Sequence, residues 1–334
     1  MTRVGVVGAG LIGGSICKSL RQAGLHSITV YSQSDSTQEE VRADGFSVVE
    51  SLNDLVQSSD VVFVCVPLEA QMNVFRDVAT AIASTARKGI VVTDVSSVKG
   101  PQAREAVELF TQVGATFVPG HPMAGTEFSG FRAATDKMFH AATWVLCPES
   151  ASHHVVADVA ELVLSMNARV SLLDINTHDA AVGSISHLPY VVAASLANVL
   201  PSSGTQELAL QLAAGSFRDG TRVAGSEPWL SASMVNFNRT EVLRLISLFQ
   251  SELTKMTEAL AAGKDKDVLE IFQNAHGVRR DYDKVKSDVT RKEVVWNVTD
   301  AIQQALTECR SGALISNISV QGNQWTVTLD GVNQ

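Results

Sequence analysis

Three glycines near the start of the chain have the spacing of a dinucleotide-binding turn. An apolar, β-branched stretch leads into Gly8, Gly10 and Gly13, and a helical pattern follows. In such a turn the first glycine permits the bend, the second lets the backbone approach a pyrophosphate, and the third lets the helix pack closely on the strand. The helix N-terminus then offers free N–H groups to the phosphates. The sequence predicts a dinucleotide site that comprises Gly8, Gly10, Leu11, Ile12 and Gly13.

The end of the next predicted strand, residues 28–31, bears on which nicotinamide cofactor is bound. An NAD site usually carries an acidic residue there, which binds the ribose hydroxyls. Here Ser32, Gln33 and Ser34 follow the strand. Because no carboxylate repels a 2′-phosphate and polar donors are available, we predict NADP as the preferred cofactor. Asp35 lies just beyond and keeps NAD as the alternative.

Two further predicted strands end in segments that face the cofactor. The stretch 60–67 is continuously apolar after Asp60, which is typical of a parallel strand buried on both faces, and it ends at Pro67. We expect Val66 and Pro67 near the nicotinamide ribose. The strand 89–94 runs into a Ser-Ser-Val-Lys segment, where Ser96 is predicted to contact the cofactor.

A histidine follows the predicted strand 115–118. His121 lies between Gly120 and Pro122, in a segment 119–127 that is expected to be a loop because it is rich in small residues and proline. Beyond the carboxyl end of a parallel strand it faces the ligand side of the sheet. A neutral imidazole is a suitable general base near pH 7. We predict a catalytic role for His121, with a buried structural histidine as the alternative.

The second half of the chain has a helical pattern from about residue 174. Pro189 interrupts the helix predicted over 177–200, so a kink is expected near His187, which either lines a site or is a satisfied core residue. A glycine-rich loop is predicted at 215–222. Its arginines, Arg218 and Arg222, either are surface charges or recognise a carboxylate.

Composition narrows the possible classes of protein. The chain has 334 residues, 45% hydrophobic and 18% charged, with a formal net charge of −9. This acidic balance argues against a nucleic-acid or anionic-membrane binder. The four cysteines are far apart, which favours free thiols in the cytoplasm over disulfides or a metal site. We find no apolar run that approaches a membrane span.

The predicted fold is α/β. We expect a Rossmann-type, doubly wound parallel sheet over residues 1–173, an all-helical substrate and dimerisation domain over 174–310, and a small β-hairpin at 311–334.

Several motifs together resemble the prephenate/arogenate dehydrogenase family of tyrosine biosynthesis, over nearly all of residues 1–310. They are Gly8-Ala-Gly-Leu-Ile-Gly13, Asp94-Val-Ser-Ser-Val-Lys99, Gly120-His-Pro-Met-Ala-Gly-Thr-Glu127, Ser186-His-Leu-Pro189 and Phe217-Arg-Asp-Gly-Thr-Arg222. The resemblance implies an oxidative decarboxylation of a cyclohexadienyl acid, L-arogenate or prephenate, with hydride transfer to NAD(P)+. It also implies a homodimer joined through the helical domains.

The resemblance assigns roles to individual residues. His121 would bond the ring hydroxyl, Ser97 would assist at the hydroxyl and the nicotinamide, and Arg222 would hold a substrate carboxylate. His187, Thr126 and Tyr190 are expected in the same substrate pocket. A charged gate at its entrance would consist of Glu127, Arg218 and Asp219.

The sequence departs from the family pattern in the region that determines substrate specificity. In some relatives a second histidine follows three residues after that of Ser-His-Leu-Pro, but here the position is Tyr190. The sequence slightly favours arogenate on this ground. Two alternatives remain: a Rossmann-fold dehydrogenase of a β-hydroxy acid, and a dinucleotide sensor without catalytic activity.

Overall fold

The computed structural model describes residues 2–85, 87–126, 128–287 and 290–331. The chain divides into two compact units. The first, which we call the nucleotide unit, comprises residues 1–178 together with 290–334. The second, the helical unit, comprises residues 179–289.

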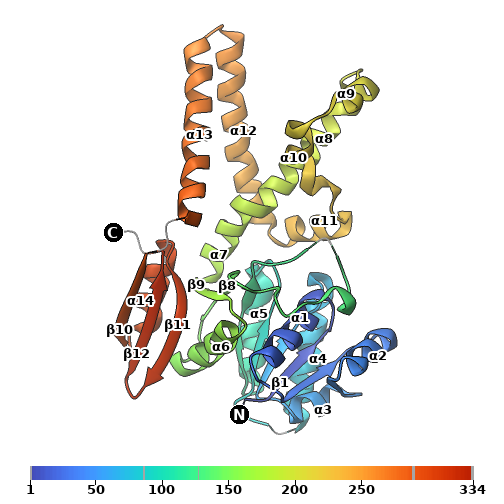
Figure 1. Ribbon diagram of the computed structural model, residues 1–334, viewed down its shortest axis with the longest axis vertical. Coiled ribbons are helices and arrows are strands. Elements are labelled where there is room, and N and C mark those ends of the chain that lie inside the picture. Colours follow the sequence, from blue (N-terminus) through green and yellow to red (C-terminus); the bar gives the residue numbers. More distant parts are fainter. Residues whose placement is uncertain (1, 86, 127, 288–289, 332–334) are drawn as a thin grey trace. The chain divides into compact units, whose positions relative to one another are not determined.

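Six parallel strands form the first sheet of the nucleotide unit, in the order β3-β2-β1-β4-β5-β6. This order is that of dinucleotide-binding folds and confirms the predicted Rossmann-type sheet. Strand β1 is labelled in Figure 1. The strands are β1 (Val4–Val7), β2 (Ile28–Tyr31), β3 (Ser47–Val48), β4 (Val61–Val64), β5 (Val91–Asp94) and β6 (Thr116–Val118). The connecting helices are α1 (Leu11–Gln22), α2 (Asp35–Ala43), α3 (Leu52–Gln57), α4 (Leu68–Thr85) and α5 (Gly100–Gln112).

Burial explains why the central strands are apolar at successive positions. Every residue of β1, β4 and β5 is buried, as expected for parallel strands covered on both faces. On one face Phe75 of α4, Phe110 of α5 and Phe117 of β6 pack together, with ring centroids 5.0–5.6 Å apart. This packing fixes the sheet whose carboxyl ends carry most of the predicted cofactor residues.

A second, mixed sheet belongs to the same unit, in the order β10-β12-β11-β9-β8-β7. Its strands are β7 (Gly120–Pro122), β8 (Thr143–Leu146), β9 (Arg169–Leu172), β10 (Arg291–Asn297), β11 (Leu314–Gln321) and β12 (Gln324–Asp330). The helices α6 (His153–Ser165) and α14 (Ala301–Arg310) accompany it, and a 3₁₀ turn spans Phe131–Ala133.

The segment around His121 differs from its prediction. Residues 120–122 form the short strand β7, in which His121 pairs with Val145 of β8, rather than a loop. Gly120 makes this possible because its backbone lies directly against the end of β5. A Cβ atom at Gly120 would lie 2.7 Å from the backbone oxygen of Asp94. The strand thus depends on a contact between distant segments, which local composition does not reveal.

The C-terminal segment is also larger than the predicted hairpin at 311–334. The hairpin of β11 and β12 is present, but β10 and α14 belong to the same assembly, and Ile315 of β11 pairs with Val170 of β9. The side chains of Trp325, Val327 and Leu329 are fully buried. Residues 290–331 therefore extend the sheet of the nucleotide unit, and the helical stretch ends earlier than the predicted boundary at 310.

The helical unit contains the long helices of the second half. The boundary between units falls within α7 (Ile175–Val182), five residues after the predicted boundary at 173. A π-helical turn at Gly183–His187 precedes Pro189, so the helix is irregular at His187, and the predicted kink itself stays a prediction. The remaining helices are α8 (Leu188–Ser202), α9 (Gln206–Leu212), α10 (Gly215–Thr221), α11 (Pro228–Phe237), α12 (Arg239–Ala261) and α13 (Asp265–Ser287).

Two sequence predictions about this region are wrong. The glycine-rich stretch 215–222 is mostly helix, α10, followed by a 3₁₀ turn at Arg222–Gly225. In addition, residues 175–202 form one helical run that is long and apolar enough to cross a membrane by length and composition. The earlier expectation missed this run because it counted only uninterrupted apolar residues. One such helix is weak support for a membrane protein, and apolar residues on it, such as Leu196 and Val199, are exposed.

Candidate active site

Each of the three glycines in the first turn has a different structural environment. Gly8 has a φ of +89°, and a Cβ atom there would lie 2.6 Å from the backbone oxygen of Cys65. A Cβ atom at Gly13 would lie 2.0 Å from the backbone oxygen of Gly8. Gly10, by contrast, is exposed at the N-terminus of α1 and has no neighbour within 4 Å of its Cβ position. Free space therefore exists where a pyrophosphate would approach the helix N-terminus.

The neighbouring predicted cofactor residues lie around the same turn. Val66, which follows β4, has its Cγ1 atom 3.1 Å from the Cβ position of Gly8. Pro67 is exposed next to it, whereas Leu11 and Ile12 form the half-buried first turn of α1. The glycine turn and the residues that follow β4 thus lie next to each other.

The end of β2 carries hydroxyl groups at the predicted ribose position. Ser32 is buried, and its backbone oxygen accepts a hydrogen bond of 2.8 Å from the side chain of Gln38. Ser34 caps α2 by accepting a bond from the N–H of Thr37, while Gln33 is exposed. This arrangement holds the backbone of the segment and leaves the nearest carboxylate on Asp35, in the first turn of α2.

A buried ion pair connects the end of β5 to the strand that carries His121. The side chains of Asp94 and Lys99 are 2% and 1% exposed, and Lys99 Nζ lies 2.6 Å from Asp94 Oδ2. Asp94 Oδ1 accepts a bond of 3.0 Å from the N–H of Gly120, and Lys99 donates to the backbone oxygen of Gly120. Gln71 of α4 donates to Asp94 Oδ2 at 2.7 Å. The pair therefore fixes both backbone polar groups of the residue before His121.

The two serines of the segment after β5 differ in their surroundings. The hydroxyl of Ser96 bonds Asp94 Oδ2 and the backbone oxygen of Val98, and Lys99 donates to it at 3.0 Å. This hydroxyl belongs to the buried network, and the predicted contact of Ser96 with the cofactor stays a prediction. Ser97 is half-buried, and its predicted role at the hydroxyl and nicotinamide stays a prediction.

His121 lies at the carboxyl edge of the first sheet, where β1, β4 and β5 also end. It is 7% exposed, and its Nδ1 atom is 2.9 Å from Nε2 of His178, a fully buried residue of α7. The sequence gives little indication of this contact because 57 residues separate the two histidines. Which of the two nitrogens in this contact carries the proton depends on the tautomers of the two rings.

Another histidine of the prediction is fixed inside the helical unit. His187 is fully buried, and its Nδ1 lies 3.0 Å from Nδ2 of Asn238. Asn238 also donates to the backbone oxygen of Asp179 at 2.9 Å. Because the amide donates to both, Nδ1 of His187 acts as an acceptor and the ring proton resides on Nε2. Sequence reasoning missed Asn238, which carries no motif and lies 51 residues away.

The remaining predicted substrate and gate residues are mostly on the surface. Arg222 is exposed in the 3₁₀ turn after α10, and Arg218 forms an exposed ion pair of 3.2 Å with Asp219. Tyr190 Oη lies 3.5 Å from Oγ of Ser226. All these residues belong to the helical unit, together with His187.

Thr126 is exposed in the nucleotide unit, where its hydroxyl accepts a bond from the N–H of Phe128. Glu127, the third predicted gate residue, lies outside the described residues. Among the residues that the structure describes, no group of three or more histidine, cysteine or carboxylate side chains is placed to hold a metal ion.

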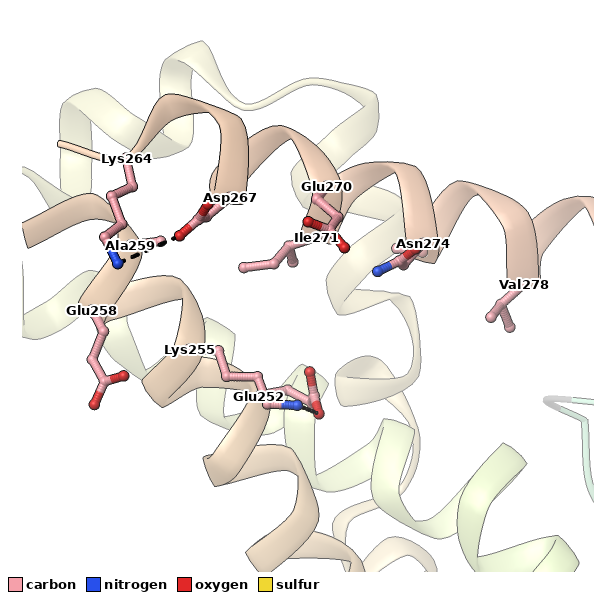
Figure 2. A pocket seen from close by; sticks show the side chains of 11 residues that line it. Glu252, Lys255, Glu258, Ala259, Lys264, Asp267, Glu270, Ile271, Asn274 and Val278 are labelled. Carbon is pink, nitrogen blue, oxygen red and sulfur yellow. Dashed lines mark hydrogen bonds and ion pairs between the residues drawn. The ribbon is translucent and has the colours of Figure 1, made fainter. Parts of the chain in front are cut away.

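A hollow between α12 and α13 has no part in this chemistry (Figure 2). It is lined by charged side chains, and two ion pairs lie along it, Lys255–Glu252 and Lys264–Asp267 (Figure 2). None of the predicted site residues lines it. The hollow is an open groove of a helix pair, and two of its carboxylates, Glu252 and Asp267, are paired with lysines.

Comparison with known proteins identifies both parts of the chain. Residues 16–172 match the nucleotide-binding domain of prephenate dehydrogenase, and residues 174–274 match its dimerization domain. The cyclohexadienyl dehydrogenase of Zymomonas mobilis is 30% identical over 285 residues, which cover 83% of this chain and 94% of that protein.

Two crystal structures resemble the whole fold. Synechocystis arogenate dehydrogenase has a TM-score of 0.74 and 28% identity, covering 84% of this chain and 99% of that one. Prephenate dehydrogenase from Aquifex aeolicus, in complex with hydroxyphenyl propionate and NAD+, has a TM-score of 0.75 and 27% identity, covering 84% and 98%. With both domains matched in order, the chain belongs to the prephenate dehydrogenase family.

Proposed function

We propose that this protein catalyses the oxidative decarboxylation of a cyclohexadienyl acid with NAD(P)+ as the hydride acceptor. In the overall reaction the ring carbon that bears the hydroxyl loses a hydride, the ring carboxylate leaves as carbon dioxide, and the ring becomes aromatic. The observation that carries the proposal is the position of His121 at the sheet edge that also carries the glycine turn. Family membership supports the same reaction.

Residues of the protein transfer the hydroxyl proton and bind the pyrophosphate of the cofactor. We assign His121 Nε2 as the acceptor of the hydroxyl proton when the ring carbon becomes a carbonyl, and as its donor when the phenol forms. Ser97 is proposed to bond the same hydroxyl. The glycine turn and the N-terminus of α1 would hold the pyrophosphate, and the bound nicotinamide supplies the hydride acceptor.

Substitution of the base tests the proposal. General base catalysis is typically worth about 10²- to 10⁴-fold in rate, so His121→Asn should lose most turnover and keep the cofactor affinity. Near-normal turnover in a folded His121→Asn protein would contradict the assignment. A sensor without catalytic activity would bind the cofactor and turn over neither acid.

We propose Arg222 as the residue that holds a substrate carboxylate, aided by Thr126, Tyr190 and His187. Its guanidinium is exposed in the helical unit and offers the planar donor pair that carboxylates prefer. Arg222→Ala should raise KM for the acid strongly with a smaller effect on kcat. An unchanged KM would count against this role. The pair Arg218–Asp219, together with Glu127, is proposed as the charged gate.

Within this reaction we propose L-arogenate as the preferred acid. Tyr190 replaces the second histidine of some relatives and faces the hydroxyl of Ser226, so a neutral pair of hydroxyls occupies this position. The ratio of kcat/KM for L-arogenate and prephenate decides the matter. A ratio that favours prephenate would overturn the preference.

We propose NADP+ as the preferred cofactor, because positions 32–34 at the end of β2 carry no carboxylate. Asp35 and the NAD+ complex of the Aquifex relative favour the alternative. Measurement of kcat/KM with both cofactors at saturating acid distinguishes them. Higher efficiency with NAD+ would reject the preference.

We further propose a cytoplasmic homodimer joined through the helical unit. Its helices expose large apolar side chains, which a second copy would cover; on α12 and α13 they include Leu253, Leu260, Phe272, Val278 and Tyr282. The match to a dimerization domain supports this. Sedimentation at micromolar concentration should give a dimer, and a monomeric protein would refute the proposal.

A further inference from the structure

His178, whose imidazole contacts that of His121, has no role in the function proposed above. We propose that His178 is a positioning residue, which accepts a hydrogen bond from Nδ1–H of His121 and so fixes His121 in the tautomer whose Nε2 is unprotonated. This inference rests on the proposed role of His121 as the base.

The geometry between the rings supports a direct hydrogen bond. Nδ1 of His121 and Nε2 of His178 are 2.9 Å apart, a normal distance for such a bond. The ring planes are inclined at 73°, with centroids 5.2 Å apart, so the rings meet edge to face rather than stacked. With both rings neutral, one nitrogen of this contact must carry the proton and the other must accept it.

The proton can be placed on one side by the chemistry that the base must perform. If His178 donated, the proton of neutral His121 would reside on Nε2, and that nitrogen could not accept a substrate proton. If His121 donates from Nδ1, Nε2 remains an acceptor. When Nε2 then takes up a proton, the Nδ1–H bond to His178 persists and stabilises the imidazolium. Only the second arrangement is compatible with base catalysis.

The burial of His178 separates its role from that of a substrate ligand. Its side chain is fully buried, whereas His121 retains 7% exposure. Because the side chain of His178 is not exposed, we assign it no contact with the substrate, and it acts on the reaction through His121. His178 therefore positions His121, and His121 is the base.

The start of α7 is anchored in a way that holds His178 in place. Asp174 accepts bonds from the N–H and the hydroxyl of Thr177, at 3.0 and 2.6 Å, and thereby caps the helix. Arg310 of α14 pairs with the same carboxylate. Glu149 accepts a bond from the N–H of Ile175 at 3.1 Å.

A further bond joins Arg104 of α5 to Asn176 at 2.6 Å. The first turn of α7 is thus tied to residues outside it, all within the nucleotide unit. On the other side, the clamp of Asp94 and Lys99 on Gly120 holds His121. Different sets of hydrogen bonds therefore hold the two imidazoles in place. Fixed positions allow His178 to select one tautomer of His121.

Substitutions at position 178 test the inference. His178→Leu removes the acceptor, and we expect kcat to fall at least about tenfold, within the range of base catalysis, while KM for the acid changes less than about threefold. His178→Gln places an amide oxygen near the position of Nε2 and should restore most of the turnover. His154→Leu, an exposed histidine on α6, is the matched control.

The outcomes are decisive in both directions. A folded His178→Leu protein with normal kcat, or a change confined to KM, would overturn the inference, as would a folded His178→Gln protein as slow as His178→Leu. Rescue by glutamine would support it, because a merely structural role gives no reason for an oxygen at this position to restore kcat.

A spectroscopic measurement keeps the inference testable if His178→Leu fails to fold. In wild-type protein with ¹⁵N-labelled histidine near pH 8, the two ring nitrogens of His121 are distinguished by their chemical shifts. Protonated Nδ1 with unprotonated Nε2 is expected, and the opposite tautomer would overturn the proposal. Should the wild-type protein turn over neither acid, the proposed function fails, while the ¹⁵N spectrum still decides the tautomer.

Discussion

The buried ion pair of Asp94 and Lys99 permits a quantitative prediction. Lys99→Met keeps an unbranched side chain of similar length but removes the charge, so Asp94 remains in a site where its side chain is 2% exposed. It also removes the donor to the backbone oxygen of Gly120. Three buried acceptors thus lose a partner in one substitution, because Lys99 also donates to the hydroxyl of Ser96.

Breaking a buried ion pair by removing one partner typically costs about 3–5 kcal/mol. For a unit of this size, each kcal/mol lowers Tm by about 2–4 °C, so Lys99→Met should lower Tm by roughly 6–20 °C. The loss of the bond to Gly120 should also displace His121. A misplacement on the order of 1 Å can cost about 10²-fold in rate, so kcat should fall in the surviving folded protein.

The assay is urea unfolding at 25 °C together with steady-state kinetics. Lys137→Met, at an exposed lysine, is the control and should stay within about 0.5 kcal/mol of wild type. In an Asp94→Asn background, Lys99→Met should cost less, since no carboxylate is left unpaired. A loss below about 1 kcal/mol for Lys99→Met, with normal kcat, would refute the argument that this pair holds the base.

Three other predictions concern the glycine turn, acid stability and the thiols. Gly10→Ala should fold normally and lose cofactor affinity in a fluorescence titration, whereas Gly13→Ala should lower Tm, because its Cβ would lie 2.0 Å from a backbone oxygen; equal Tm values would contradict this. Burial raises the pKa of Asp174, but bonds from Thr177 and Arg310 outweigh it and lower that pKa from 3.8 to about 2. The stabilisation that ionised Asp174 gives the folded protein is therefore complete above about pH 4 and is lost as the pH falls toward 2. Asp174→Asn should lessen the acid-induced drop in Tm over this range. Parallel curves of Tm against pH for the variant and the wild type would argue against it. Burial raises the pKa of Cys17 to about 12 and that of Cys309 to about 11, so neither should react with Ellman's reagent at pH 8 until urea unfolds the protein, and their rapid modification in the native state would disprove the burial.

Sequence patterns predicted the first sheet well because its signals are local. The strand at Val4–Val7 and the glycine turn after it are defined by adjacent residues, and the order of strands follows from the rules of right-handed crossover connections. The strand predicted over 28–31 coincides with β2, Ile28–Tyr31. His121 was found from its position after a strand.

The features that sequence reasoning missed depend on distant contacts. Strand β7 pairs with β8 more than twenty residues later, and Gly120 and Pro122 are poor strand formers by themselves. The contact of His121 with His178 and that of His187 with Asn238 each join segments more than fifty residues apart. Strand β10 alternates apolar and polar residues only weakly, and it is defined by its pairing with β12.

The pairing of β9 with β11 has a consequence for synthesis of the protein. The nucleotide unit includes residues 290–331, so about a hundred residues of helix leave the ribosome before its second sheet can close. Until then β9 and α6 lack β11, the strand that contacts both in the folded unit. The nascent chain therefore exposes part of this hydrophobic core while its middle third is translated. Chaperone binding would be most useful during this period.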